Sequence, residues 1–341
     1  MNVPARPVQI SIGHVTTASP TEALAALLSH ELMATEAEIV VRMDSPVGLI
    51  PDVAHHLVDA GGKRLRPILT LAAAKICGGG GVPAIKLATA VEFIHTATLL
   101  HDDVVDGSSL RRGKRAANLI WGDKASVLVG DFLFARAFNL MVETGSLRIL
   151  DILAQASSTI AEGEVLQLAS TNRGEASRER YHQVIEAKTA ALFRAACEAG
   201  ALTATTDETV VEAFATYGNE LGLAFQLVDD ALDYGGASNT MGKNAGDDFR
   251  EGKATWPLII AMERAEGEEQ LFWQRVLARK HSEDDLPFAI QTVRKRGAVE
   301  ATLDEARVHI GNAKVALTLV PQGVLTDLLG ELADYVILRA N

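Results

Sequence analysis

The sequence has 341 residues, of which 48% are hydrophobic and 22% charged, and a formal net charge of −12. This composition can fill a large core and is unlike that of a disordered chain. A nucleic-acid partner is not expected, because such binders present a basic face. The two cysteines, Cys77 and Cys197, both lie in apolar stretches, so neither a disulfide framework nor a zinc site is expected.

Residues 1–20 lack the compact apolar segment of a signal peptide, and we interpret them as a flexible N-terminal arm before one helical domain at residues 21–341. Uninterrupted apolar runs of eighteen residues are missing, so no transmembrane helix is expected. We therefore expect a soluble, cytoplasmic protein, whose contact with a membrane is at most peripheral.

From residue 21 onward, apolar residues recur at helical spacing. The breaks between periodic segments fall at glycines, prolines and two polar loops, at residues 170–180 and 235–255. Alternating strand patterns are missing, so the sequence predicts an all-α protein, a single large helical bundle. The predicted helices are 21–43, 68–76, 83–106, 123–145, 146–169, 181–202 and 207–234, with further charged helices after Pro257.

Three aspartates lie at the end of the predicted helix 83–106, and four basic residues follow shortly after them. Aspartates three and four residues apart lie on neighbouring positions of one helix face, and their repulsion must be relieved by protonation or by a cation. Magnesium takes oxygen ligands and bridges to phosphates, while arginine binds phosphate oxygens in pairs. The bases therefore favour a metal–diphosphate site over a solvated helix end. The residues are Asp102, Asp103, Asp106, Arg111, Arg112, Lys114 and Arg115.

The same D-D-x-x-D spacing returns in Asp229, Asp230 and Asp233, at the end of the predicted helix 207–234. One such motif arises easily by chance, but two that each close a long apolar helix are a strong signal. If these helices face each other, they can hold one diphosphate between them through magnesium ions.

With these motifs the sequence resembles the trans-polyprenyl diphosphate synthases, and among them the long-chain, octaprenyl-type bacterial enzymes. The resemblance runs from about residue 20 to the C-terminus. It implies the isoprenoid synthase fold, a helical bundle with a central active-site cavity, and a homodimer. It rests on GGKRLRP, EFIHTATLLHDDVVDGSSLRRGKRAAN, SVLVGDFLFARAF, IAEGEVLQL, KTAALF, AFQLVDDALDY and GKNAGDDFREGKAT, which follow one another in the family's order.

The resemblance also implies a reaction. Isopentenyl diphosphate units are added to an allylic diphosphate such as farnesyl diphosphate by magnesium-assisted ionisation, condensation and elimination, with three magnesium ions in each active site. Asp102, Asp106 and Asp229 would be the metal ligands. The remaining catalytic residues that it implies are Asp103, Asp230, Asp233 and Lys188.

Two groups of residues are assigned to the substrates by the same resemblance. Their positions give partial independent support: Lys63 and Arg66 precede a predicted helix whose N-terminus favours anions, and His95 lies two turns before Asp102 on one face. The alternative interpretations are that His95 is a buried core residue and that Lys188 is an ordinary surface lysine. Isopentenyl diphosphate would contact Lys63, Arg66, His95 and Arg112, and the allylic diphosphate Arg111, Lys188, Thr189, Gln226, Lys243 and Lys253.

Product length is predicted from Ala97 and Thr98, five and four residues before Asp102, where short-chain relatives carry bulky aromatic residues. The small side chains predict an open tunnel and octaprenyl to decaprenyl products. A role in making the ubiquinone side chain is implied by the resemblance alone. The tunnel floor could be Phe93, Phe138, Met141 or a residue of a second subunit. The alternatives are a geranylgeranyl or farnesyl diphosphate synthase, a terpene cyclase, a regulatory subunit that has lost an acid motif, and a metal-buffering helical protein.

Overall fold

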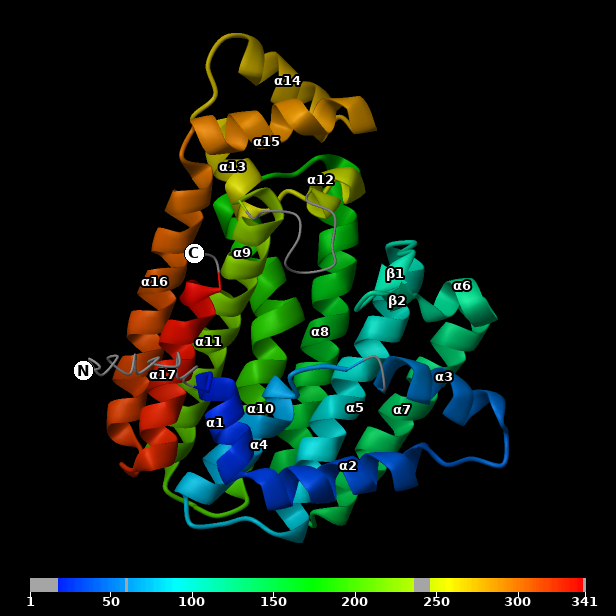
Figure 1. The fold of residues 1–341 in the computed structure, drawn as a ribbon, viewed down its shortest axis with the longest axis vertical. Coiled ribbons are helices and arrows are strands. Elements are labelled where there is room, and N and C mark those ends of the chain that lie inside the picture. The colour runs from blue at the N-terminus through cyan, green and yellow to red at the C-terminus, as the bar shows by residue number, and fades with distance from the viewer. Residues whose placement is uncertain (1–17, 59–60, 236–245, 340–341) are drawn as a thin grey trace, which may run out of the picture.

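The computed structural model describes residues 18–58, 61–235 and 246–339, and long helices dominate this part of the chain. Figure 1 shows α5, α7, α8, α10 and α11 running along the long axis of a single bundle, with α14 and α15 packed at one end. The expected all-α fold is confirmed. The expectation of no strands is wrong at one place among the described residues, where β1 (Leu110–Arg111) pairs antiparallel with β2 (Lys114–Arg115).

The elements follow one another along the chain with short connections. The first half contains α1 (Pro20–Leu27), α2 (Ser29–Met43), α3 (Leu49–Val58), α4 (Leu65–Ile76), α5 (Val82–Val105), α6 (Ala117–Trp121), α7 (Asp123–Glu143) and α8 (Leu147–Arg173). The second half contains α9 (Arg178–Ile185), the π-helical turn η1 (Glu186–Ala190), α10 (Ala191–Leu202), α11 (Glu208–Gly235), α12 (Asp247–Glu251), α13 (Trp256–Glu263), α14 (Glu268–Leu277), the 3-10 turn η2 (Glu283–Asp285), α15 (Leu286–Lys295), α16 (Ala298–Ala316), the 3-10 turn η3 (Leu317–Leu319) and α17 (Val324–Leu338).

Helix α10 lies between two buried apolar clusters. Phe193 and Cys197 join the cluster formed mainly by α4, α11, α13, α16 and α17, whereas Ala195 and Ala199 join the one formed by α2, α3, α5, α7 and α8. The packing is close because of glycine: a Cβ atom on Gly200 would lie 2.4 Å from the Thr70 carbonyl oxygen of α4. This close packing fixes α5 and α11, which carry the two acid motifs, relative to each other.

Several predicted boundaries were wrong, and the predicted loop 235–255 contains the helix α12. The predicted helix 21–43 is divided at Leu28, whose φ of −105° and ψ of 16° end α1 and turn the chain into α2 (Figure 1). The predicted loop 170–180 is partly helical, because α8 continues to Arg173 and ends where Gly174 adopts a left-handed φ of 64°. The predicted helix 181–202 is interrupted by η1.

Two further predictions concern the N-terminus and membranes. Residues 1–17 of the predicted arm lie outside the described residues, while the side chain of Ser19 caps α1 and Pro20 is the first residue of that helix. Helix α7 is long and apolar enough to cross a membrane, but 39% of its most apolar stretch is buried, and core helices of globular proteins meet the same criterion. The expectation that no helix spans a membrane therefore stays a prediction.

Candidate active site

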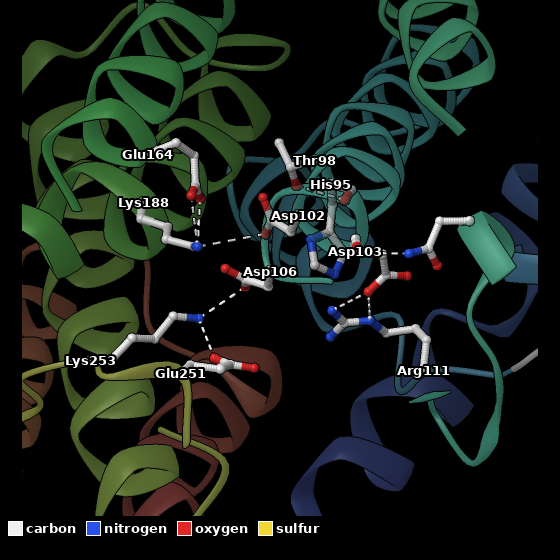
Figure 2. A network of polar contacts seen from close by, with 11 residues as sticks. His95, Thr98, Asp102, Asp103, Asp106, Arg111, Glu164, Lys188, Glu251 and Lys253 are labelled. Carbon is white, nitrogen blue, oxygen red and sulfur yellow. Dashed lines mark hydrogen bonds and ion pairs between the residues drawn. The ribbon is translucent and has the colours of Figure 1, made fainter. Parts of the chain in front are cut away.

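The first acid motif lies at the C-terminal end of α5, and its three side chains point in two directions (Figure 2). Asp102 and Asp106 point toward two lysines: Lys188 Nζ is 3.7 Å from Asp102 Oδ2, and Lys253 Nζ is 2.9 Å from Asp106 Oδ2. Asp103 points the opposite way, toward Arg111. The helical spacing therefore presents two carboxylates, not three, on the face shared with the lysines.

Asp103 is fully buried and anchors the β1–β2 hairpin to α5. Its Oδ1 accepts hydrogen bonds from Nε and Nη2 of Arg111 at 2.9 and 2.5 Å, and its carbonyl oxygen accepts one from Asn118 at 3.0 Å. Burial raises the pKa of Asp103, and the contact with Arg111 opposes that effect. In this structure Asp103 thus orients Arg111 beside the motif.

Each lysine is also held by a glutamate. Lys188 Nζ is 2.7 Å from Glu164 Oε1, and Lys253 Nζ is 2.6 Å from Glu251 Oε2. Burial alone would lower the pKa of Lys253, but Glu251 and Asp106 outweigh it and the net shift is upward. Burial raises the pKa of Asp102 to about 7, although Lys188 acts in the opposite direction. Acids and bases of the site therefore neutralise one another.

In the second acid motif, Asp230 is the buried member and is linked to three polar side chains. It accepts hydrogen bonds from the Tyr181 hydroxyl at 2.6 Å and from Gln226 Nε2 at 2.7 Å, and Thr189 Oγ1 donates to Gln226 Oε1 at 2.9 Å. Burial raises the pKa of Asp230 to about 7 despite these contacts. The network fixes Thr189 and Gln226 at the wall of the site.

Asp233 and Asp229 have different environments. Asp233 accepts main-chain hydrogen bonds from Gly246, Asp247 and Asp248 at 3.1, 3.2 and 3.2 Å, and so caps the start of α12. Asp229 is more accessible, with 37% of its side chain exposed, and Arg339 Nη2 lies 3.9 Å from its Oδ1. Asp229 is therefore the member of this motif that is best placed to meet a ligand.

A cavity of about 140 Å³ lies beside the second motif. Its polar wall contains five residues predicted to act in the site, and its apolar wall comes from α9, α13 and α14, with Val184, Leu258 and Leu277. The five are Lys188, Thr189, Gln226, Asp230 and Lys253. These residues, distant in sequence, thus share one pocket whose mixed lining suits a ligand with an anionic head and an apolar tail.

The second predicted group of bases gathers around the start of α4. Arg66 lies inside the first turn of that helix, its Nη1 is 3.3 Å from His95 Nε2, and its guanidinium stacks over the Phe193 ring at 4.4 Å. Burial lowers the pKa of Arg66 to about 10. Burial also lowers the pKa of His95 well below its usual value, and the nearby charge of Arg66 acts in the same direction. His95 is therefore neutral at pH 7 and can take part in hydrogen bonds without adding charge.

Arg112 and Lys63 complete this group. A Cβ atom on Gly62 would lie 3.0 Å from Arg112 Nη1, which donates to the carbonyl oxygen of Gly61, so glycine lets the loop pack against the arginine. Lys63 Nζ is 6.0 Å from the ring of Tyr335 on α17. Burial lowers the pKa of Lys63, and the positive charge of Arg339 lowers it further.

Sequence reasoning gave no role to Tyr181, Glu251 or Arg339, which contact Asp230, Lys253 and Asp229. No local pattern signals Tyr181 and Arg339, because they are far from their partners in the chain. Lys243 lies outside the described residues.

The predicted chain-length residues lie on α5 below the first motif. Ala97 is fully buried, and the half-buried Thr98 donates from its hydroxyl to the His95 carbonyl oxygen at 2.8 Å. Among the proposed floor residues, Phe93 and Met141 are fully buried, whereas Phe138 is 39% exposed. Phe138 therefore lies at the surface of this chain, and Phe93 and Met141 are the better candidates for a tunnel floor within it.

Within the described ranges, no three His, Cys, Asp or Glu side chains lie close enough together to hold a metal ion. Magnesium commonly binds through one or two carboxylates together with substrate phosphates. Asp102 and Asp106 on α5, and Asp229 on α11, supply oxygen donors of the right kind. The site thus fits a cation that binds together with a diphosphate.

Comparison with known proteins identifies the family. The polyprenyl synthetase family model matches residues 47–293. Octaprenyl diphosphate synthase of Escherichia coli K12 is 39% identical over 318 residues, which cover 93% of this chain and 98% of the relative. A polyprenyl synthase from Caulobacter crescentus CB15, solved with calcium and isoprenyl diphosphate, is 53% identical with a TM-score of 0.91, covering 95% of this chain and 99% of that chain. A decaprenyl diphosphate synthase from Rhodobacter capsulatus is 50% identical with a TM-score of 0.90, and the match covers 94% of this chain and 100% of that chain. The chain therefore belongs to the polyprenyl synthetase family and is a prenyltransferase.

Proposed function

We propose that the chain is a long-chain trans-polyprenyl diphosphate synthase that adds isopentenyl diphosphate units to an allylic diphosphate such as farnesyl diphosphate. The observation that supports this proposal is the presence of two separate basic groups, one in contact with the first acid motif and one around the start of α4. One contains Lys188 and Lys253. The other contains Arg66 and Arg112, next to the neutral His95. A two-substrate condensation needs two diphosphate pockets.

The first basic group is assigned to the allylic diphosphate. Lys188 and Lys253 would exchange their contacts with Asp102 and Asp106 for phosphate oxygens, and Arg111, held by Asp103, would add a third cation. Thr189 and Gln226 supply hydrogen-bonding groups on the opposite wall. Together they hold the diphosphate in line for departure from the allylic carbon.

Magnesium, for which we propose three ions in each site, would supply positive charge that stabilises the departing diphosphate. Asp102, Asp106 and Asp229 are the proposed ligands. The buried Asp230 and the capping Asp233 keep α11 and α12 in position around them. The carboxylates therefore act through the cations, without forming a covalent bond to the substrate.

The second basic group is assigned to isopentenyl diphosphate, with Lys63, Arg66, Arg112 and His95 binding its diphosphate. Its double bond attacks the allylic carbocation, a carbon–carbon bond forms, and a proton leaves the adjacent carbon. We assign no side-chain base, because the departing diphosphate can accept that proton. The allylic product is one isoprene unit longer and can react again.

Long products are supported by the small side chains of Ala97 and Thr98 and by the octaprenyl and decaprenyl synthases among the similar proteins. Alanines also line the buried cluster below, including Ala156 and Ala195. Octaprenyl to decaprenyl products for the ubiquinone side chain are our proposal, and a farnesyl or geranylgeranyl product is the alternative.

We further propose a cytoplasmic homodimer whose contact with a membrane, for product release, is peripheral. Its subunit contact would include α7, which exposes Leu128 by 66% and Val142 by 63%, together with the partly exposed Phe138. Exposed apolar side chains on one helix favour contact with a second surface.

The experiment that tests the function is incorporation of labelled isopentenyl diphosphate into an organic-soluble product. Incorporation should require both farnesyl diphosphate and magnesium, and should stop when magnesium is chelated. A terpene cyclase would consume the allylic diphosphate and leave the label in water, and a regulatory subunit alone would do neither.

A further inference from the structure

The ammonium group of Lys188 lies between two carboxylates of different elements. Its Nζ is 2.7 Å from Glu164 Oε1 of α8 and 3.7 Å from Asp102 Oδ2 of α5 (Figure 2). The nearer Glu164 also accepts a hydrogen bond from Lys188 at 2.9 Å through Oε2. In this structure the lysine is therefore bound to Glu164 and only approaches the aspartate.

The backbone around both residues is shaped for this contact. Lys188 lies in the π-helical turn η1, an irregularity that is common at functional sites. A Cβ atom on Gly163 would lie 2.8 Å from Ala187 Cβ and 3.0 Å from the Lys188 main-chain nitrogen. Glycine at 163 thus lets α8 pack directly against η1, and the next residue, Glu164, reaches the ammonium group.

Lys253, the second lysine of the site, makes the kind of contact with an aspartate that Lys188 does not make. Lys253 Nζ lies 2.6 Å from Glu251 but also forms a 2.9 Å hydrogen bond with Asp106. If Glu164 lost its charge, Asp102 would be the remaining acid beside Lys188, and attraction at low dielectric would draw the two together. A lysine bound to Asp102 would occupy an oxygen that a cation needs.

We propose that Glu164 is a positioning residue, which holds Lys188 away from Asp102 so that the aspartate stays available to the cation and the lysine to the allylic diphosphate. This inference rests on the proposed function. It gives the motif IAEGEVLQL, which contains Glu164, a role: to keep an acid and a base of the site apart.

The test is the magnesium concentration that gives half-maximal binding of an unreactive farnesyl thiodiphosphate, measured by calorimetry. Glu164→Gln should raise that concentration about two- to fivefold, the effect of one partly exposed ion pair. The matched control is Glu162→Gln on the same helix, where the side chain is exposed and its hydrogen bond is to Ser158 at 3.5 Å. The control should bind like the wild type.

A double-mutant cycle shows whether Glu164 acts through Lys188. In a Lys188→Gln background, Glu164→Gln should raise the magnesium requirement no further. In the chain that keeps Lys188, Glu164→Asp retains the negative charge and should bind with a magnesium requirement close to that of the wild type. An unchanged magnesium requirement in a folded Glu164→Gln variant would overturn the inference, as would a full additional effect without Lys188. If the wild type itself shows no magnesium-dependent binding of the analogue, the proposed function fails instead.

Discussion

Replacing Ala97 with Phe should shorten the product, because a phenyl ring then blocks the path of the growing chain. Ala97 is fully buried on α5, five residues before Asp102, or about 7.5 Å at 1.5 Å per residue. The diphosphate end is fixed at the acid motifs, so a growing tail passes this level early. We expect products to end at the farnesyl or geranylgeranyl stage.

A second variant turns this prediction into a graded test. Ala90, also fully buried, lies seven residues before Ala97, two turns deeper on the same face of α5 and about 18 Å from Asp102. Ala90→Phe should therefore stop elongation later than Ala97→Phe. Added bulk in a packed core costs about 1–3 kcal/mol, which a domain of this size can lose and stay folded.

The assay is the length distribution of products formed from the shorter primer geranyl diphosphate, with the rate of the first condensation, which gives farnesyl diphosphate, measured separately. The first condensation takes place above the block, so its rate should stay close to that of the wild type in both variants. An active Ala97→Phe enzyme with unchanged product length would refute the reasoning, because the tunnel would then not follow this face of α5.

Three further predictions concern charge. Asp102→Ala should reduce turnover by at least about 10³-fold with the thermal melting curve little changed, since a proposed cation ligand is lost; near-normal turnover at saturating magnesium would contradict the assignment. Lys63→Ala should raise KM for isopentenyl diphosphate, and Lys253→Ala that for the allylic substrate, each by roughly ten- to a hundredfold; equal effects on both substrates would argue against two pockets. Contacts with Lys295 and Arg296 hold the pKa of Glu269 at about 2, below its unfolded value, so their stabilisation is present above pH 4.5 and is lost as pH falls toward 2. In urea titrations, the free energy of unfolding of Glu269→Gln should fall less than that of the wild type as pH is lowered from 4.5 toward 2, by at most about 2 kcal/mol. An unchanged pH profile would contradict the pairing.

The sequence alone predicted the helical fold, because helical periodicity is a local property that repeats along nearly the whole chain. It predicted the position of the two acid motifs at helix ends for the same reason. It did not predict the break at Leu28, because no helix-breaking residue stands there.

Within the candidate site, residue types were easier to predict than contacts. The motifs identified Lys188 and Asp230, but not that Glu164 binds the first or that Tyr181 donates to the second, because those partners come from other helices. Nor could spacing show that Asp103 and Asp233 are engaged with Arg111 and the start of α12. Such roles depend on tertiary packing, which spacing within one helix does not encode.

The most direct test of the central claim is the mass of the lipid product made from farnesyl diphosphate, excess isopentenyl diphosphate and magnesium. The account predicts polyprenyl diphosphates that are octaprenyl to decaprenyl in length. Products that stop at geranylgeranyl diphosphate would contradict the long-chain assignment, and a cyclised hydrocarbon with no incorporated isopentenyl unit would contradict the synthase itself.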